Sequence, residues 1–228
     1  MTAANTYLPS DPNPDRKALA FAGGVVRARL DADPQAYRVE TDQAEIYAFA
    51  DFLDPVECEE MIALIDKDAR PSTLYDHGLG PSHRTSYSCD VDRDFHLVQM
   101  IERRISDCLG LAPDCGETMQ GQRYLPGQEF RPHYDWFWTR AKYWKDERRR
   151  GGQRCWTTMI YLNAVEEGGE TAFSRIGLSI PPQRGVLLAW NNATPEGRPN
   201  MAVLHAGTPV TRGVKHIITK WHRTRAWG

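Results

Sequence analysis

Near its end the chain reads Lys215-His216-Ile217-Ile218-Thr219-Lys220-Trp221-His222, an alternating pattern that indicates a β-strand. Successive side chains on a strand point to opposite sides. One face would therefore carry Lys215, Ile217, Thr219 and Trp221. A lysine among apolar neighbours is costly to bury unless it meets an anion. Two interpretations of Lys215 follow: it binds an anion inside the protein, or it ends the strand and reaches solvent.

The chain before this strand changes character at Gly110. After Gly110, glycine and proline separate further strand-like runs, at residues 157–163, 178–180 and 186–190. Before it, residues 16–50 combine a short helical pattern with a strand-like run at residues 45–49. Asp54, Pro55 and Glu57 then form a helix start with a capping box, and a second helix runs from about residue 95 to 109. Helices followed by strands predict an α+β, mainly β domain, a sandwich or barrel that N-terminal helices brace.

The length of 228 residues allows one domain with a sizeable core. We expect residues 1–15, which are polar and rich in proline, to form a disordered tail, and residues 16–228 to form the single domain. The net charge of −2 shows no preference for nucleic acid or an anionic membrane, and no apolar run is long enough to span a bilayer. The sequence does not decide the oligomeric state.

The cysteines favour a reducing compartment. There are five of them, an odd number, and none forms a CxxC pair. That pattern fits neither a zinc ribbon nor a disulfide framework. Reduced, structural thiols in the cytoplasm are therefore the expectation.

A candidate metal site begins in the segment Arg131-Pro132-His133-Tyr134-Asp135. On a strand, His133 and Asp135 would project from the same face, and one more histidine would complete a 2-His-1-carboxylate site for Fe(II). An isolated HxD is common by chance. Of the other histidines, His205 has the most suggestive setting, whereas His77, His83 and His96 are expected at the surface.

Together these segments resemble the prolyl 4-hydroxylase branch of the 2-oxoglutarate/Fe(II)-dependent dioxygenases. The resemblance covers residues 44–225 and rests on several blocks in order. They are Arg84-Thr85-Ser86, Gln122-x-Tyr124-x-x-Gly127-x-x-Phe130-x-x-His133-x-Asp135, Gly151-Gly152-Gln153-Arg154, Tyr161-Leu162-Asn163, Glu167-Gly168-Gly169-Glu170-Thr171-x-Phe173, His205-Ala206-Gly207-x-Pro209-Val210-x-x-Gly213-x-Lys215 and Lys220-Trp221. It implies a double-stranded β-helix, a jelly-roll or cupin-like barrel, with its core at about residues 115–225.

The resemblance also implies roles for single residues. The iron ligands would be His133, Asp135 and His205. Lys215 would bind the distal carboxylate of 2-oxoglutarate, with Thr171 as a hydroxyl donor and with Tyr124 and Trp221 beside the cosubstrate. The residues implied at the substrate are Arg154, Phe130 and Arg223. Fe(II), 2-oxoglutarate and O2 would hydroxylate a prolyl C–H bond of a peptide or protein, with succinate and CO2 as coproducts and ascorbate as a further expected ligand.

Three positions depart from the family pattern. Phe130 stands where many relatives carry tyrosine, Arg223 where some carry histidine, and Thr208 where cysteine is frequent. Phe130 and Arg223 are at positions that the resemblance places at the substrate. A free amino acid or another small molecule therefore stays open as the substrate. A nucleic-acid dealkylating oxygenase would be expected to carry arginine in place of Lys215. A jelly-roll binding module without catalysis is the alternative from a different class.

Residues 136–153 form a long segment, first aromatic and then basic, between two predicted strands. Segments of this length in a compact domain are usually functional or mobile. It could be a lid over a bound peptide, or a solvated basic loop on an aromatic stem.

Overall fold

The structure is a computed structural model that describes residues 15–73 and 81–228. Its N-terminal part contains α1 (Arg16–Ala32), β1 (Tyr37–Arg38), β2 (Ile46–Phe49), α2 (Pro55–Asp68), β3 (Arg70–Pro71), η1 (Pro81–His83), β4 (Tyr87–Asp90), α3 (His96–Leu109) and η2 (Pro113–Cys115). The C-terminal part contains β5 (Gln120–Tyr124), β6 (Phe130–His133), α4 (Trp144–Arg149), β7 (Arg154–Tyr161), β8 (Glu167–Gly168), β9 (Thr171–Phe173), β10 (Leu178–Ile180), β11 (Leu187–Asn191), η3 (Met201–Val203), β12 (His205–Gly207), β13 (Val210–Arg212) and β14 (Lys215–Arg223).

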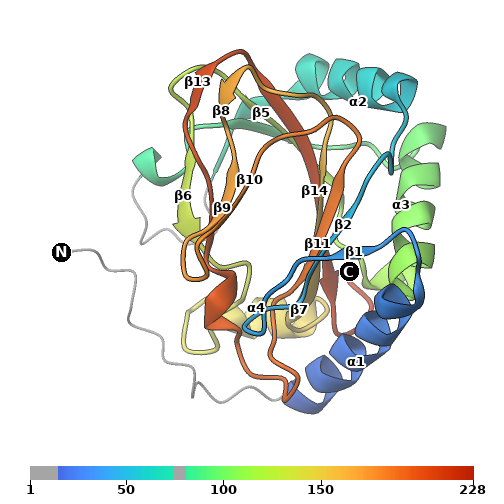
Figure 1. Cartoon of the computed structure of the whole chain (residues 1–228). Coiled ribbons are helices and arrows are strands. Elements are labelled where there is room, and N and C mark those ends of the chain that lie inside the picture. Colours follow the sequence, from blue (N-terminus) through green and yellow to red (C-terminus); the bar gives the residue numbers. More distant parts are fainter. Residues whose placement is uncertain (1–14, 74–80) are drawn as a thin grey trace.

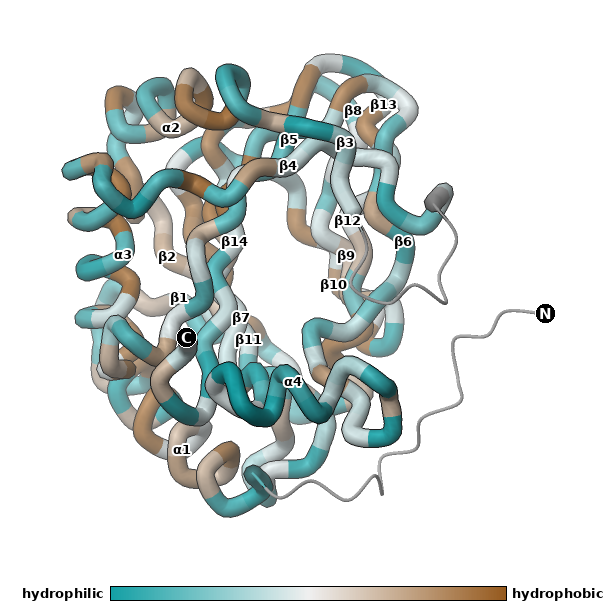
Figure 2. The backbone as a smooth tube through the Cα atoms, turned by 180° about the vertical axis from the view of Figure 1, so that it is seen from behind, coloured by the Kyte–Doolittle hydropathy of each residue, from teal (hydrophilic) through white to brown (hydrophobic). Residues whose placement is uncertain are grey.

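Two antiparallel sheets face each other across the interior. The large sheet has the strand order β1-β2-β11-β7-β14-β5-β4-β3, and the small sheet has the order β10-β9-β12-β6. A two-stranded pair, β13 and β8, lies at one end (Figure 1). From behind, the two sheets lie on opposite sides, and the hydrophilic α4 lies near one end of them (Figure 2). Among the described residues, the strands form separate sheets and not a closed barrel.

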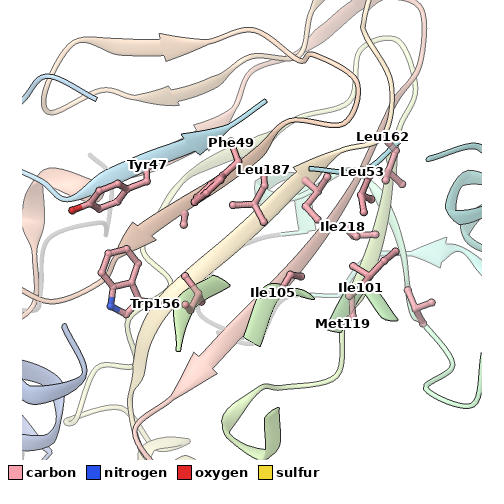
Figure 3. Close-up of a cluster of buried hydrophobic side chains, with 14 of the residues drawn as sticks. Tyr47, Phe49, Leu53, Ile101, Ile105, Met119, Trp156, Leu162, Leu187 and Ile218 are labelled. Carbon is pink, nitrogen blue, oxygen red and sulfur yellow. The ribbon is translucent and has the colours of Figure 1, made fainter. Parts of the chain in front are cut away.

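Helices α1, α2 and α3 cover the outer face of the large sheet (Figure 1). Their apolar stripes and the outward-facing residues of the sheet form one buried cluster, in which Ile101 and Ile105 of α3 meet Trp156, Leu187 and Ile218 of the sheet (Figure 3). A second cluster fills the space between the two sheets and is made of inward-facing residues. The predicted bracing of a mainly β domain by N-terminal helices is confirmed.

Strand β14 divides its side chains between these two clusters, as the alternation of its sequence predicts. Ile217 belongs to the interior cluster between the sheets, whereas Ile218 belongs to the cluster under the helices. Lys215 therefore projects into the interior and is only 2% exposed, so the alternative in which it reaches solvent is wrong.

The predicted helix boundaries also hold. Asp54 caps α2 with a full capping box, and α3 ends at Gly110, whose φ of 68° is the left-handed conformation that glycine adopts readily. The predicted tail at residues 1–14 lies outside the described residues. Asp15 is buried and accepts a hydrogen bond from the backbone N–H of Gln153, so the end of the predicted tail is held. No helix in the described ranges is both long and apolar enough to cross a bilayer.

Candidate active site

The candidate metal ligands lie together where β6 and β12 pair. His133 and His205 are register partners, and their ring centroids are 4.3 Å apart. Asp135 follows just beyond the end of β6, so it lies outside the strand that the HxD spacing suggested. Potential ligand atoms of His133, Asp135 and His205 all lie within 4.8 Å of one another. The sequence prediction that these three residues converge is confirmed.

Both imidazoles are oriented for metal binding by backbone carbonyls. Nδ1 of His133 lies 2.9 Å from the carbonyl of Arg131, and Nδ1 of His205 lies 3.0 Å from that of Val203. A neutral imidazole that donates from Nδ1 leaves the Nε2 lone pair free for a metal. Burial, with a contribution from His205, holds the pKa of His133 well below its usual value, so this ligand is neutral at neutral pH.

The Asp135 carboxylate is surrounded by donors. Its Oδ2 accepts a 2.7 Å hydrogen bond from the hydroxyl of Thr157 and lies 3.7 Å from Nε2 of His205, and its Oδ1 lies 3.9 Å from the guanidinium of Arg154. Two imidazoles and one carboxylate form the ligand set that suits Fe(II) and leaves coordination positions open. The residues present therefore fit the metal that the sequence analysis expects.

Lys215 supplies an unpaired cation further along the interior. It forms no hydrogen bond or ion pair with any residue in the described ranges, and its Nζ lies 5.4 and 5.5 Å from the rings of Tyr124 and Tyr161. Burial lowers the pKa of Lys215 to about 7. A buried ammonium without a carboxylate partner is costly, so this position suits a ligand that brings its own anion.

The other residues predicted at the cosubstrate lie around this cation or beside the metal ligands. Thr171 pairs with Gly207 on β12, and a Cβ on Gly207 would lie 3.8 Å from Nζ of Lys215. The hydroxyl of Thr171 accepts a 2.6 Å hydrogen bond from Tyr161. Trp221 lies near the other end of β14, as the register partner of Thr157. Trp221 is therefore closer to the Asp135 end of the site than to Lys215.

Two of the three predicted substrate residues lie at the metal site. Phe130 stacks on the imidazole of His133 with ring centroids 3.6 Å apart. Arg154 places its guanidinium 4.1 Å from the Trp221 ring centroid and binds the Glu117 carboxylate through two hydrogen bonds of 2.6 and 2.8 Å.

The prediction that Arg223 contacts substrate is corrected by the structure. Its side chain is 2% exposed, and all three of its nitrogens bind within the protein. They donate to Glu117, to the carbonyl of Gly152 and to Glu147. A substrate contact would require these bonds to break, so Arg223 instead fastens β14 to the segment that contains α4.

That segment, residues 136–153, has a buried aromatic part and an exposed basic part. Trp136, Phe137 and Trp144 are buried, whereas the basic residues at 148–150 are exposed. Gln153 closes the segment with hydrogen bonds of 2.8 and 2.7 Å to the backbone N–H and carbonyl of Phe137. The solvated basic run was predicted correctly, and the lid remains a prediction.

Sequence reasoning assigned no role to Arg84, yet it lies in the site. Its guanidinium is 4.9 Å from the ring centroid of Phe130, and no carboxylate among the described residues forms an ion pair with it. It donates to Gln120 and Ser86 instead, and burial lowers its pKa. Its only sequence signal was the Arg84-Thr85-Ser86 block.

His83 was expected at the surface and is partly exposed; its ring also lies near that of Phe130, with ring centroids 6.1 Å apart. His77 lies outside the described residues.

Comparison with known proteins agrees with this geometry. Residues 119–223 match the family model of the 2OG-Fe(II) oxygenase superfamily. Probable prolyl 4-hydroxylase 3 of Arabidopsis thaliana is 34% identical in an alignment 201 positions long that covers 77% of this chain and 68% of the relative. Prolyl 4-hydroxylase 1 of the same plant is 30% identical in an alignment 230 positions long that covers 89% of this chain and 79% of the relative.

Solved structures are similar as well. The 2OG complex of the viral collagen prolyl hydroxylase from Paramecium Bursaria Chlorella virus-1 is 30% identical and has a TM-score of 0.60, with 77% of this chain and 94% of that chain covered. A Trichoplax adhaerens prolyl hydroxylase in complex with a peptide fragment is 15% identical with a TM-score of 0.56, and 95% of each chain is covered. This second likeness shows a shared fold, the jelly roll that the sequence analysis expected.

Proposed function

The chain belongs to the prolyl 4-hydroxylase-like family of 2-oxoglutarate/Fe(II)-dependent dioxygenases, and we propose that it hydroxylates a prolyl residue of a peptide or protein. As a member of this family it uses Fe(II) and 2-oxoglutarate. When bound, these groups activate O2, and oxidative decarboxylation to succinate and CO2 accompanies insertion of one oxygen atom into a C–H bond. The protein positions the reactants and excludes water.

The observation that carries the proposal is the spacing between the triad and Lys215. His205 and Gly207 lie two residues apart on β12, roughly 7 Å along an antiparallel strand. Nζ of Lys215 lies beside Gly207. A dicarboxylate that begins at the metal and runs along β12 would therefore bring its far carboxylate to the unpaired ammonium. In this proposal His133, Asp135 and His205 hold the iron, and Thr171 and Tyr124 border the cosubstrate.

The substrate side of the proposal rests on the relatives and on the donors around Phe130. The relatives named above are prolyl 4-hydroxylases, and one is a collagen prolyl hydroxylase. Arg84 and Arg154 both lie near the metal ligands, and Arg84 has no carboxylate partner among the described residues. An unpaired guanidinium there suits the carbonyl groups of a peptide. We also place the protein in a reducing compartment such as the cytoplasm, because all five cysteines are free thiols.

The first test asks for the iron–cosubstrate complex. Under nitrogen, Fe(II) and then 2-oxoglutarate are added to the purified protein, and the weak visible charge-transfer band of the chelate is recorded. We expect the band in the wild type, its loss in His133→Ala and its weakening in Lys215→Ala, with exposed Lys17→Ala as the matched control. A wild type without the band would overturn the oxygenase site and would favour a binding module.

The second test concerns the substrate. Proline-containing peptides and free amino acids are incubated with Fe(II), 2-oxoglutarate and O2, with and without ascorbate, and the products are read by mass spectrometry. Addition of one oxygen to peptidyl proline supports the proposal. Turnover of free amino acids alone would replace it with a small-molecule hydroxylase.

A further inference from the structure

The carboxylate of Asp135 is held by a hydroxyl from the opposite sheet. Thr157 lies on β7, is fully buried, and projects into the interior with Met159 and Tyr161 as its neighbours on the same strand face. Its Oγ1 lies 2.7 Å from Oδ2 of Asp135. No other side-chain hydroxyl among the described residues bonds to this carboxylate, so Thr157 is its closest protein donor.

In this hydrogen bond the Thr157 hydroxyl donates and the Asp135 carboxylate accepts. A second buried residue, Asn192, holds the hydroxyl from its other side. The Thr157 oxygen then accepts from Nδ2 of Asn192 at 2.9 Å, and the amide orientation of Asn192 is set as well. The relay therefore runs from the amide of Asn192 to the hydroxyl of Thr157 and on to the carboxylate of Asp135.

The main chain of Asn192 is held beside β7. Its backbone N–H donates to the carbonyl of Cys155 at 2.8 Å, and its carbonyl accepts from the backbone N–H of Asn200 at 3.0 Å. The side chain is buried, so its amide has a fixed position from which Nδ2 donates to Thr157.

The two oxygens of the Asp135 carboxylate have different neighbours. Oδ1 forms a long ion pair with the guanidinium of Arg154, at 3.9 Å. Oδ2 lies 3.7 Å from Nε2 of His205, and it is the oxygen that the Thr157 hydroxyl holds. Glu117, which already binds Arg154 twice, reduces the pull of that guanidinium.

We propose that Thr157 and Asn192 are positioning residues that keep the Asp135 carboxylate turned toward the two imidazoles and thereby set the affinity for Fe(II). This inference rests on the proposed iron site. Partners that orient a metal ligand typically contribute about 10–100-fold to metal affinity. The protein thus needs a hydroxyl at residue 157, and a donor at residue 192 that directs it.

The test is an anaerobic titration of the protein with Fe(II) alone. Thr157→Val keeps the side-chain shape and removes the hydroxyl, and we expect Fe(II) to bind about 10–100-fold more weakly. Thr157→Ser restores the hydroxyl and should bind within about twofold of the wild type, in the range that a retained positioning partner allows. Asn192→Leu should lie between them, because the hydroxyl remains but is no longer directed.

A matched control comes from the next residue of the strand. Thr158 faces the other side of the sheet, where its hydroxyl donates to the carbonyl of Lys220. Thr158→Val makes the same chemical change in the same strand and should leave Fe(II) affinity unchanged. The charge-transfer band formed with 2-oxoglutarate gives a second measurement: it should shift in Thr157→Val and not in Thr158→Val.

The outcomes separate the inference from the function. If the wild type and Thr157→Val bind Fe(II) equally well, the positioning role is wrong and the iron site stands. Equal losses in Thr157→Val and Thr158→Val would mean general damage to β7 and would also overturn the role. If the wild type itself binds no Fe(II), the proposed function and this inference fail together.

Discussion

Phe130 lies flat against the imidazole of His133, with ring centroids 3.6 Å apart and ring planes inclined by 13°. The guanidinium of Arg84 lies 4.9 Å from the centroid of the same ring. Phe130 therefore joins a cation to a metal ligand and restricts rotation of that imidazole. Phe130, where many members of the family carry tyrosine near the substrate, thus also supports a metal ligand of this protein.

The first prediction concerns this stack. Phe130→Leu removes the aromatic contact with His133, which is worth about 0.5–1.5 kcal/mol, or roughly a 2–13-fold loss of Fe(II) affinity. Phe130→Tyr keeps the ring and should bind Fe(II) like the wild type. Anaerobic calorimetric titration measures both. Equal affinities in all three proteins would show that the stack does not orient the ligand.

The second prediction concerns the fastening of residues 136–153. Arg223 and Glu147 form an ion pair in which both side chains are only 2% exposed. Removal of one partner from a buried pair typically costs about 3–5 kcal/mol, because a charge is left without its partner. Arg223→Met should therefore lower the free energy of unfolding in urea by that order. The double variant Arg223→Met/Glu147→Leu should recover part of the loss.

Exposed Arg148 on the same helix serves as the control, and Arg148→Met should change stability by no more than about 0.5 kcal/mol. If Arg223→Met and Arg148→Met unfold alike, the pair does not hold α4 in place. A lid that moves freely would then again be a candidate for this segment.

The third prediction tests the start of α2. The Asp54 side chain accepts a 2.8 Å hydrogen bond from the backbone N–H of Glu57, and Asp54→Ala should cost about 1 kcal/mol of stability. Asp54→Asn keeps the acceptor and should cost less. Because α2 lies on the outer face of the large sheet, Fe(II) affinity should stay unchanged in both. A metal-binding defect in Asp54→Ala would contradict the separation of the helices from the site.

Local rules predicted much of this fold. The capping box at Asp54, the stop at Gly110 and the alternation of β14 depend on neighbours in sequence, and all three are found. The run at residues 45–49 was predicted to be strand-like and forms β2. The pairing of β2 with β11, and of β4 with β5, was not predicted, because these partners lie far along the chain.

The full length of α1 was missed for a related reason. Gly23 and Gly24 interrupt the helical pattern, and glycine lowers helix propensity. A Cβ on Gly23 would lie 2.8 Å from Nδ2 of Asn191, so the helix needs this glycine to pack closely on β11. Only the tertiary contact explains the residue.

Some residues of the candidate site could be predicted from the sequence, and others could not. His133, Asp135, His205 and Lys215 could be identified because the motif blocks around them resemble a known family; the HxD spacing and the strand alternation alone left these assignments open. Thr157 and Asn192 could not, since a threonine in a strand and an asparagine after one are ordinary. Arg223 was misplaced because sequence shows the position but not the buried carboxylates that occupy its nitrogens.

The last prediction is a pH dependence of cosubstrate binding. Burial lowers the pKa of Lys215 to about 7 in the protein without cosubstrate. A carboxylate from 2-oxoglutarate would raise that pKa, because it stabilises the ammonium, so binding takes up a proton wherever free Lys215 is neutral. Affinity for 2-oxoglutarate should be flat below about pH 7 and should fall by up to about tenfold per pH unit above it.

The measurement is a 2-oxoglutarate titration of the Mn(II)-loaded protein from about pH 6.5 to about pH 8.5, in buffers of different ionisation enthalpy to count the proton. Lys215→Met should bind 2-oxoglutarate weakly and without this slope. A wild-type affinity that stays constant across the range would mean that Lys215 remains charged throughout, or that it does not meet the carboxylate; a wild-type affinity no better than that of Lys215→Met would decide for the second.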